Sequence, residues 1–328
     1  MKFGVIGTGW ITEAFIEGAL LYGCMEPGAV YSRELGRARE FARKYGCDNA
    51  FDSLEAMADF DGIEAVYIAS PNALHYRQSK LFLEHGKHVI CEKPSAVTAE
   101  KYCELAALAD SKGLVYLEAI MFMHHPQRET IKKALAETGN ITTARLDFSQ
   151  LSSKYSLLVE GKNPNIFNPA LGAGCLMDMG VYCLYPALEW FGEPAEVSAR
   201  AGFVSTGADG FVNSIFSYPD KQVDITLSKT GQSLIGSEVL GDKATLKIGF
   251  IVLMTDVWLA TKGGKPEKVI EDNSRAEVMG AEANDFCRYI REYAKHEAEY
   301  RHNRDITLKV MQKLDLIRSL VGIDIRDA

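Results

Sequence analysis

HVICEKP, residues 88–94, is the stretch that points most directly to the fold. Its central run, VIC, is short and apolar, as expected of a strand that is buried on both faces. The run stops at Glu92 and Lys93, and open α/β sheets bind their ligands beyond the carboxyl ends of such strands. Pro94 cannot donate to a sheet, and a cis Lys93–Pro94 bond would turn the lysine into the crevice. An adjacent Glu and Lys at a strand end are also typical of an ordinary surface ion pair. The rest of the sequence must therefore decide between a ligand site and a surface ion pair.

Apolar runs alternate with helical patterns throughout the first 120 residues. This alternation predicts an α/β fold with a doubly wound parallel sheet. The expected strands are residues 2–6, 29–31, 64–69, 87–91 and 114–118. One expected helix follows the first strand and ends near residue 22, and two more cover residues 73–84 and 98–111. Thr98 is expected to cap the last of these helices.

A glycine turn follows the first strand. It reads GTGWIT from residue 7 to residue 12, so that Thr12 replaces the third glycine of the full G-x-G-x-x-G motif. Between a strand and a helix, such a turn lets backbone N–H groups approach a dinucleotide pyrophosphate. We therefore expect a nicotinamide dinucleotide cofactor here. The residues expected to hold it are Gly7, Thr8, Gly9, Trp10 and Ile11.

Ser32 and Arg33 follow the second strand. Enzymes that use NAD usually have Asp or Glu at this point, where a carboxylate would repel a 2′-phosphate. An arginine instead forks onto phosphate oxygens, and Arg37, one helical turn later, can add a second contact. The sequence therefore favours NADP over NAD. The alternative is that both arginines are ordinary solvated residues at a helix start.

Other loops at the same sheet edge are also expected to reach the cofactor. Ser70, Pro71 and Asn72 end the strand at 64–69 and would pass beneath the ribose. His75 either touches the ribose or bonds a backbone group. Glu92 and Lys93 complete the expected cofactor contacts.

The second half contains the stretch LGAGCLMDMGVYCLYPALEWFG, residues 171–192. A small-residue turn at 172–174 leads into a predicted helix on which Asp178 and Tyr182, four residues apart, share one face. Aromatic residues at such spacing are more often part of a core. An acidic partner one turn away, on a helix that begins in a glycine turn, nevertheless favours a site role for Tyr182.

Residues 197–259 alternate with period two, which predicts a large open, mainly antiparallel sheet. Two helices are expected near 275–298 and at 304–321, with Gly322 as the stop. The expected domains are residues 1–120, which bind the dinucleotide, and residues 121–328, which bind substrate and join copies of the chain into a homodimer or higher homo-oligomer.

Composition excludes several classes of protein. The 328 residues carry a net charge of −8, which argues against a nucleic-acid partner or an anionic membrane surface. The seven scattered cysteines form no C-x-x-C pair and suggest reduced thiols in the cytoplasm. No apolar span is long enough for a membrane helix. Neighbouring His124 and His125 lack the spacing of metal ligands, so no metal is expected.

Taken together, the motifs resemble those of the Gfo/Idh/MocA family along essentially the whole chain. The motifs that carry the resemblance are VIGTGWI (5–11), YSRELGRA (31–38), ASPNALH (69–75), GKHVICEKP (86–94) and GAGCLMDMGVYCLYPALEWFG (172–192). The resemblance implies an N-terminal Rossmann domain and a C-terminal α/β domain whose open sheet often serves oligomerisation.

The resemblance also implies an NADP(H)-dependent oxidoreductase that acts on a sugar, polyol or diol. Lys93 would contact the reacting hydroxyl or carbonyl, while Asp178 and Tyr182 complete the site. Many members have histidine where Tyr182 stands, whereas the glucose–fructose oxidoreductase and dihydrodiol dehydrogenase branch has tyrosine, and this chain resembles that branch. Met123 and Ile166 stand where many members have arginine, which makes the expected pocket less polar.

The expected roles follow from the chemistry of each side chain. Lys93 holds the substrate oxygen, Tyr182 acts as general acid and base, and Asp178 bonds Lys93 or the substrate and fixes the geometry. The alternative function is a non-catalytic NADP-binding sensor on the same fold. Such a sensor would need none of these three side chains.

Overall fold

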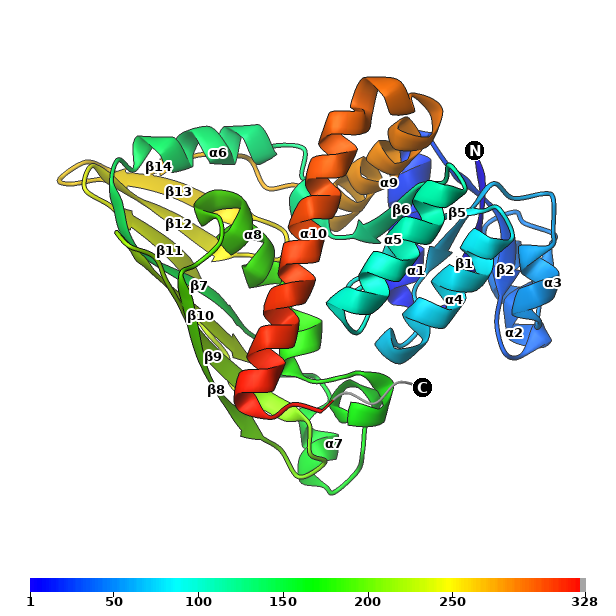
Figure 1. The fold of residues 1–328 in the computed structure, drawn as a ribbon, viewed down its shortest axis with the longest axis horizontal. Helices are drawn as coiled ribbons and strands as arrows, with labels where there is room; N and C mark the ends of the chain where they lie inside the picture. Colours follow the sequence, from blue (N-terminus) through cyan, green and yellow to red (C-terminus); the bar gives the residue numbers. More distant parts are fainter. Residues whose placement is uncertain (325–328) are drawn as a thin grey trace. The chain divides into compact units, whose positions relative to one another are not determined.

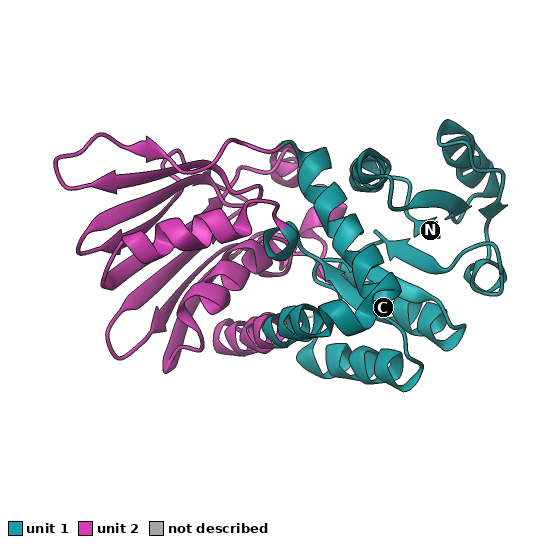
Figure 2. Cartoon of the chain, turned by 90° about the horizontal axis from the view of Figure 1, so that it is seen from above, with its two compact units in different colours: residues 1–124, 274–308, 328 teal, residues 125–273, 309–327 magenta. Residues whose placement is uncertain are grey.

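The computed structural model describes residues 1–324, which form two compact units (Figure 2). Among the described residues, unit 1 consists of residues 1–124 and 274–308, and unit 2 consists of residues 125–273 and 309–324. The units therefore do not follow a single division at residue 120. Residues 274–308, which the sequence assigned to the C-terminal domain, return to the first unit.

Unit 1 contains a six-stranded sheet in the order β3-β2-β1-β4-β5-β6, in which every pair is parallel (Figure 1). Its strands are β1 (Lys2–Ile6), β2 (Glu26–Tyr31), β3 (Ala50–Phe51), β4 (Ala65–Ile68), β5 (His88–Glu92) and β6 (Tyr116–Ala119). The apolar run VIC of β5 is fully buried, as its composition predicts. The predicted parallel sheet is confirmed.

The helices of unit 1 follow its strands and continue in the returning segment, residues 274–308. They are α1 (Trp10–Tyr22), α2 (Leu35–Lys44), α3 (Leu54–Ala58), α4 (Asn72–Glu84), α5 (Ala99–Ser111), the 3₁₀ turn η1 (Met121–His124), α9 (Arg275–Arg291) and the first part of α10 (Tyr293–Val321). The Thr98 hydroxyl accepts a bond from the Lys101 N–H at 3.2 Å, which confirms the predicted cap. The last two helices meet at Glu292 instead of between residues 298 and 304.

Helix α9 packs directly on α1. The two helices approach so closely that a Cβ at Gly18 would lie 2.6 Å from both the Ala276 carbonyl oxygen and the Gly280 nitrogen. Only glycine fits such a crossing, because no backbone atom can move aside. The second half of the sequence thus supplies a helix that covers the parallel sheet beside α1.

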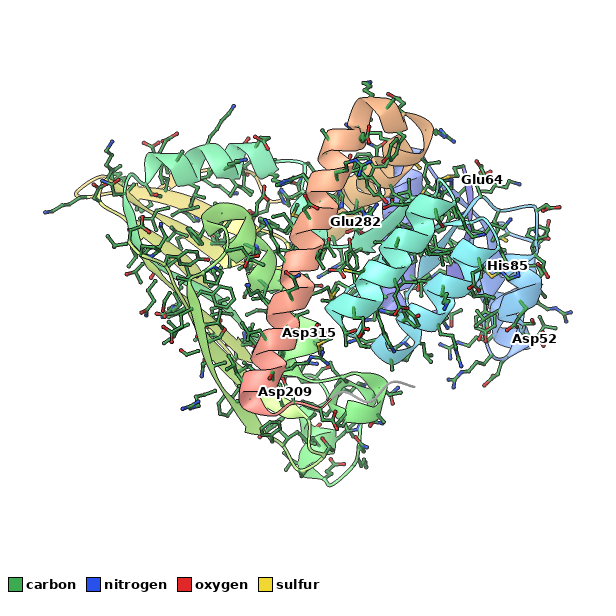
Figure 3. The ribbon with its side chains drawn as sticks, in the orientation of Figure 1. Asp52, Glu64, His85, Asp209, Glu282 and Asp315 are labelled. Carbon is green, nitrogen blue, oxygen red and sulfur yellow. The ribbon has the colours of Figure 1, made fainter. Side chains whose placement is uncertain are left out.

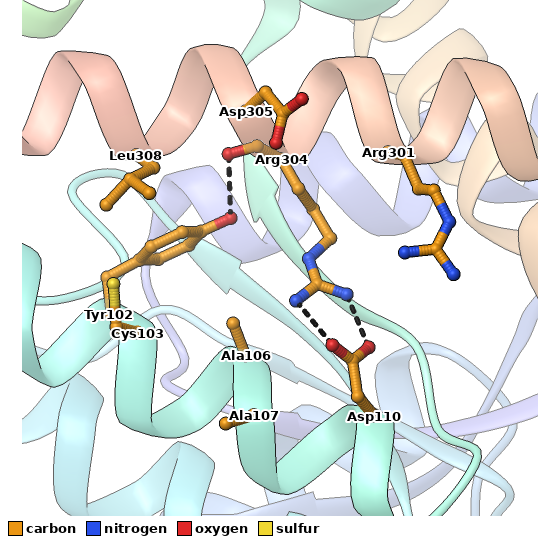
Figure 4. A pocket seen from close by; sticks show the side chains of 9 residues that line it. All are labelled: Tyr102, Cys103, Ala106, Ala107, Asp110, Arg301, Arg304, Asp305 and Leu308. Atoms are coloured by element: carbon orange, nitrogen blue, oxygen red, sulfur yellow. Dashed lines mark hydrogen bonds and ion pairs between the residues drawn. The ribbon is translucent and has the colours of Figure 1, made fainter.

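The start of α10 is held on α5 by charged and aromatic groups (Figure 4). The Tyr102 hydroxyl donates to the Arg304 carbonyl oxygen at 3.4 Å, and the Arg304 guanidinium bonds both oxygens of Asp110 at 2.5 and 3.1 Å. A groove of about 410 Å³ lies beside them. Arg301, which also lines it, is paired with Glu297. Both arginines of this groove are therefore occupied by carboxylates.

Unit 2 contains an eight-stranded sheet in the order β14-β13-β12-β11-β7-β10-β9-β8. Its strands are β7 (Ile141–Ser149), β8 (Glu196–Phe203), β9 (Asp209–Ser217), β10 (Gln222–Ser228), β11 (Ser237–Gly241), β12 (Ala244–Phe250), β13 (Thr255–Thr261) and β14 (Glu267–Lys268). All pairs are antiparallel except β7 with β10. The predicted large, mainly antiparallel sheet is confirmed.

Strand β7 was not expected from the sequence, although it lies at the centre of this sheet. Its buried Ala144 and Leu146 alternate with Thr143 and Arg145, a weak apolar signal spread over nine residues. The strand forms because it has partners on both sides: β10 in parallel and β11 in antiparallel orientation. Long-range pairing outweighs local composition here.

One face of the unit 2 sheet is covered by helices, and side chains on the other face remain exposed. The helical segments of this unit are α6 (Arg128–Glu137), α7 (Tyr155–Val159), the 3₁₀ turns η2 (Asn165–Phe167) and η3 (Pro169–Leu171), the π turn η4 (Leu176–Gly180), α8 (Val181–Phe191) and the end of α10. Helix α8 contacts β7 and β10, and η4 contacts β9 and β10. Among the described residues, no helix has both the length and the apolar character needed to cross a bilayer.

Candidate functional site

Four neighbouring strands of unit 1 end at the same edge of its sheet. Because β2, β1, β4 and β5 are adjacent and parallel, the residues that follow them lie along one line. These residues are Ser32, Gly7, Ser70 and, at the end of β5, Glu92. The structure therefore brings together predicted cofactor residues from four separate stretches.

The glycine turn at this edge fits a dinucleotide pyrophosphate. Gly7 has φ of 105°, and a Cβ there would lie 2.5 Å from the Ala69 carbonyl oxygen, so no other residue fits. Gly9 is the N-cap of α1 and, having no side chain, cannot cap the first N–H groups of the helix. A Cβ at Gly9 would meet nothing within 4 Å. The helix N-terminus thus has open space beside it, as an anion site requires.

The two arginines beyond β2 are exposed, and no described carboxylate forms an ion pair with either one. Ser32 is half-buried, and its hydroxyl accepts a bond from the Glu34 N–H at 3.4 Å. Within residues 1–324, the guanidinium groups of Arg33 and Arg37 are available to a ligand. This arrangement is suited to a 2′-phosphate, and the role of both residues stays a prediction.

His75 ties the ends of two strands together. Its Nδ1 lies 2.8 Å from the Pro94 carbonyl oxygen and its Nε2 lies 2.8 Å from the Ser70 carbonyl oxygen. Burial lowers the pKa of His75, and the Lys93 ammonium acts in the same direction. Since both ring nitrogens face backbone groups, His75 follows the backbone-bonding alternative and has no nitrogen left for the ribose. Its neighbour Ser70 donates its hydroxyl to Gln78 at 2.6 Å.

The Glu92 carboxylate, at the end of β5, is fixed by two hydrogen bonds, one of which comes from the backbone of Lys93. The Tyr67 hydroxyl donates to Glu92 Oε1 at 2.5 Å, and the Lys93 N–H donates to Oε2 at 3.3 Å. The Tyr67 ring in turn stacks on Phe15 with centroids 3.9 Å apart. Burial raises the pKa of Glu92, and the Lys93 ammonium opposes this shift. The Lys93–Pro94 peptide bond is cis.

In unit 2, a buried carboxylate fixes the turn that precedes Asp178. Gly174 has φ of 153°, and a Cβ there would lie 2.0 Å from Asp209 Oδ1. Asp209 Oδ2 accepts a bond from the Leu176 N–H at 2.6 Å (Asp209 is labelled in Figure 3). Burial raises the pKa of Asp209, and its bond from Leu176 acts against the shift. Asp209 therefore aligns the start of η4.

Asp178 lies in the π turn η4, which continues into α8, so the predicted helix is present and begins with a π turn. Its Oδ2 lies 2.7 Å from Nζ of Lys229, whose side chain is only 2% exposed. Lys229 also donates to the Ile166 carbonyl oxygen at 3.3 Å and lies 5.8 Å from the centroid of the Phe167 ring. Asp178 thus pairs with Lys229, and its expected bond to Lys93 or to the substrate stays a prediction.

Lys229 was missed by the sequence analysis, although the sequence carries a signal for it. Residues 223, 225 and 227 of β10 are buried apolar positions, and Lys229 continues their alternation just beyond the strand. A lysine at a position that should be apolar needs a buried partner. That partner is Asp178.

Tyr182 lies in the first turn of α8 and is half-buried. Its ring packs edge-on against Phe148 of β7, with centroids 5.4 Å apart at 87°, and Phe148 packs in the same manner on Phe250. These contacts fix the direction of the phenol. The structure thus places Asp178, Tyr182 and Lys229 in unit 2, and Lys93 in unit 1.

The two positions that lack the family arginine are occupied by apolar side chains. Met123 is buried in η1, and Ile166 packs on a buried cluster of Leu158, Phe167 and Ala208.

The neighbouring histidines are engaged separately from one another. His124 Nδ1 lies 3.0 Å from Asp285 Oδ2, and His125 Nδ1 accepts a bond from the Gln127 N–H at 3.2 Å. Burial lowers the pKa of His125 to about 4. Among residues 1–324, no group of three His, Cys, Asp or Glu side chains is arranged to hold a metal ion.

Comparison with known proteins agrees with this architecture. Residues 1–120 match the model of the GFO_IDH_MocA oxidoreductase family with an NAD-binding Rossmann fold, and residues 129–247 match the GFO/IDH/MocA C-terminal domain. The chain is 38% identical over 314 residues to scyllo-inositol 2-dehydrogenase (NADP(+)) of Bacillus subtilis, covering 95% of each chain. It is 30% identical to human trans-1,2-dihydrobenzene-1,2-diol dehydrogenase, covering 80% of this chain and 77% of the relative.

Solved structures share the fold. A 3-ketoreductase from Actinomadura kijaniata, in complex with NADP and TDP-benzene, superposes with a TM-score of 0.82 at 22% identity and 98% coverage of both chains. The predicted fold class, the oxidoreductase activity and the nicotinamide dinucleotide cofactor are confirmed. The chain therefore belongs to the GFO/IDH/MocA family of NAD-binding oxidoreductases.

Proposed function

We propose that the protein is an NADP(H)-dependent dehydrogenase of cyclic polyols or diols, transferring hydride between nicotinamide and a CH–OH or C=O carbon. Two relatives support this class, because inositol and dihydrobenzenediol both carry hydroxyl groups on neighbouring carbons of a six-membered ring. The apolar positions at Met123 and Ile166 are consistent with an uncharged substrate.

The observation that carries the proposal is the edge of the unit 1 sheet. A glycine turn, two arginines without ion pairs among the described residues, and a lysine occur beyond four adjacent parallel strands. Backbone N–H groups at Gly9 would take the pyrophosphate, and Arg33 and Arg37 would take the 2′-phosphate. The arginines favour NADP over NAD, since no carboxylate occupies the position after β2.

The bound cofactor would supply the hydride acceptor at its nicotinamide ring. Lys93 would donate a hydrogen bond to the reacting oxygen and stabilise its negative charge. Tyr182 would take the hydroxyl proton, with its ring direction set by Phe148. Asp178 would bond the substrate. Because Lys229 neutralises its charge, Asp178 would raise the pKa of the Tyr182 phenol less than an unpaired carboxylate would.

The test is a turnover screen with purified protein. NADP⁺ reduction is followed with scyllo-inositol, myo-inositol, trans-cyclohexane-1,2-diol, glucose and an acyclic diol. We expect reduction with cyclic vicinal diols, and we expect Lys93→Met to lose most of this activity while still binding NADPH. Binding of NADPH without consumption across the whole panel would instead favour a non-catalytic sensor.

We also propose that copies of the chain assemble through the open face of the unit 2 sheet. Phe211, Ile215 and Leu240 are exposed on strands of this sheet and alternate with buried neighbours. Apolar side chains on a sheet face favour burial against a partner. Light scattering should give a homodimer or a higher homo-oligomer, and Ile215→Lys should shift the species toward monomer. A wild-type monomer at micromolar concentration would contradict this.

For location, we propose the cytoplasm. The support is that all seven cysteines are free thiols, six of them buried. Cell fractionation with an antibody would test it, and recovery from an oxidising compartment would contradict it.

A further inference from the structure

Helix α9 runs parallel to α1, so both helices begin at the cofactor edge of unit 1. Three contacts establish the direction. Arg275, the first residue of α9, lies over Trp10, the first residue of α1; Gly280 meets Gly18; and near the other ends Cys287 donates its thiol to the Cys24 carbonyl oxygen at 3.4 Å. The start of α9 therefore lies beside the glycine turn.

The start of α9 is held in place by its own cap. The Ser274 hydroxyl accepts a bond from the Glu277 N–H at 3.2 Å, and the Glu277 carboxylate accepts one from the Ser274 N–H at 2.7 Å. This capping box satisfies the first N–H groups of the helix and fixes the backbone from which Arg275 extends.

The Arg275 side chain lies on residues of the cofactor edge. Its guanidinium carbon is 5.3 Å from the centroid of the Trp10 ring, and its Nη1 is 3.9 Å from the sulfur of Met121. Its positive charge also lowers the pKa of Glu92, at the end of β5, against the larger effect of burial. Arg275 is itself half-buried.

This guanidinium has no carboxylate partner within residues 1–324. Three other arginines of the same returning segment do have one: Arg288 pairs with Asp285, Arg301 with Glu297 and Arg304 with Asp110. A half-buried cation without an anion is costly, and a bound anion would remove that cost.

We propose that Arg275 is a further cofactor-binding residue, which takes the pyrophosphate of the dinucleotide together with the glycine turn. The inference rests on the proposed binding of the cofactor at this edge. A cation–π contact with Trp10, the first residue of α1, holds the guanidinium at this helix start. Arg275 would thus act differently from Arg33: NADP and NAD share the pyrophosphate, whereas only NADP carries the 2′-phosphate.

The test is a titration of the folded protein with three ligands: NADP⁺, NAD⁺ and adenosine 2′-monophosphate, which lacks a pyrophosphate. Arg275→Met should weaken NADP⁺ and NAD⁺ by the same factor, about tenfold or more, since it removes a charge-assisted bond common to both. It should leave adenosine 2′-monophosphate unchanged. Arg33→Met should give the opposite pattern, weakening NADP⁺ and adenosine 2′-monophosphate but not NAD⁺.

Arg291→Met is the matched control, because Arg291 is the exposed last residue of the same helix. Its affinities should equal those of the wild type. Melting temperatures are measured for every variant to show that it is folded. If Arg275→Met does not fold, the same titrations are made with Arg275→Gln. Unchanged affinity for NADP⁺ and NAD⁺ in a folded Arg275 variant would overturn the inference, as would a loss confined to NADP⁺. If Arg33→Met weakens NADP⁺ binding as expected while Arg275→Met leaves all affinities unchanged, the proposed cofactor site stands and only the role of Arg275 is rejected.

Discussion

Each unit carries a lysine beside a carboxylate, but the two pairs are built differently. In unit 1, Glu92 and Lys93 are consecutive, and the end of β5 places them at the ligand edge. In unit 2, Asp178 and Lys229 come from distant stretches and meet only because η4 packs on β10. The first pair can be recognised in the sequence, and the second exists only in the folded chain.

The difference extends to what each region offers a ligand. The edge of unit 1 presents backbone N–H groups and permanently charged arginines, which bind anions without titrating near neutral pH. Unit 2 presents a phenol and a paired carboxylate, which can exchange or orient protons. Changes at the unit 1 edge should therefore alter cofactor affinity, and changes in unit 2 should alter turnover.

The largest effect is expected for Tyr182→Phe, which keeps the ring on Phe148 and removes only the hydroxyl. Turnover should fall by about 10² to 10⁴, the usual contribution of a positioned acid or base, while NADPH affinity stays unchanged. Steady-state kinetics and a cofactor titration check both parts. Tyr218→Phe, which removes a phenol bonded to the Gly192 carbonyl oxygen, is the control. A loss below about fivefold with an unshifted pH profile would assign the proton to another group.

Lys229→Met should have the next largest effect, because it leaves Asp178 without its cation. We expect kcat to fall by about tenfold to a hundredfold, since a charge-assisted bond contributes about 1.5–3 kcal/mol. The unneutralised carboxylate should also raise the pKa of the Tyr182 phenol, so the acidic limb of the oxidation profile should move to higher pH.

The pH profile separates this positioning role from a purely structural one. Lys229→Met combined with Asp178→Asn should restore the position of the acidic limb, because the uncompensated charge is gone. Lys247→Met, which removes a half-exposed lysine of β12, should change neither kcat nor the profile. An unshifted profile in a folded Lys229→Met variant would mean that the pair only supports the turn.

A smaller effect is expected for Arg33→Asp, which should change cofactor preference and leave the chemistry alone. The variant should lose about tenfold or more in affinity for NADPH, while NADH binding stays the same or improves. Titrations of both cofactors measure the ratio, and Arg39→Asp on the exposed side of α2 is the control. Equal curves for the two cofactors in the wild type would remove the basis for choosing NADP.

The smallest effect concerns Glu282, labelled on α9 in Figure 3. Both of its carboxyl oxygens are buried and have no hydrogen-bond partner in the part of the chain that the structure describes. Burial, with Glu92 and Asp285 nearby, raises the pKa of Glu282 well above its usual range. At pH values between the pKa of Glu282 in the unfolded state, near 4.3, and its pKa in the folded state, only the folded state holds the proton. As pH rises through this range, the free energy of unfolding therefore falls, by at most about 1.36 kcal/mol per pH unit.

Glu282→Gln should remove this slope. The difference in unfolding free energy between variant and wild type should therefore grow in favour of the variant as pH rises above about 4.3. Denaturant unfolding at several pH values measures it. Exposed Glu267→Gln should show no such trend. A difference that stays constant with pH would mean that Glu282 is ionised in the folded protein.

Much of unit 1 could be predicted from the sequence because its signals are local. The glycine turn, the Thr98 cap and the HVICEKP strand each depend on a few consecutive residues. In unit 2, Gly322, with φ of 74°, likewise ends α10 as its position predicts. The parallel order of strands then follows from the alternation of strands and helices.

Other features could not be predicted in this way, since they depend on partners far along the chain. Strand β7 pairs with β10 and β11, and its own pattern is too polar to identify it. Asp209 fixes the turn at Gly174, and Lys229 neutralises Asp178. Arg275 reaches the glycine turn only because α9 returns to unit 1.

The sequence by itself thus determined the parallel sheet, the cofactor edge and the family, because backbone conformation and strand burial are encoded within short windows. The tertiary structure alone decided which charges are paired and which helix lies beside the glycine turn. Charge pairing depends on the approach of side chains hundreds of positions apart in some cases, and no local pattern specifies it. Arg275 against Trp10, from opposite ends of the chain, is the plainest example.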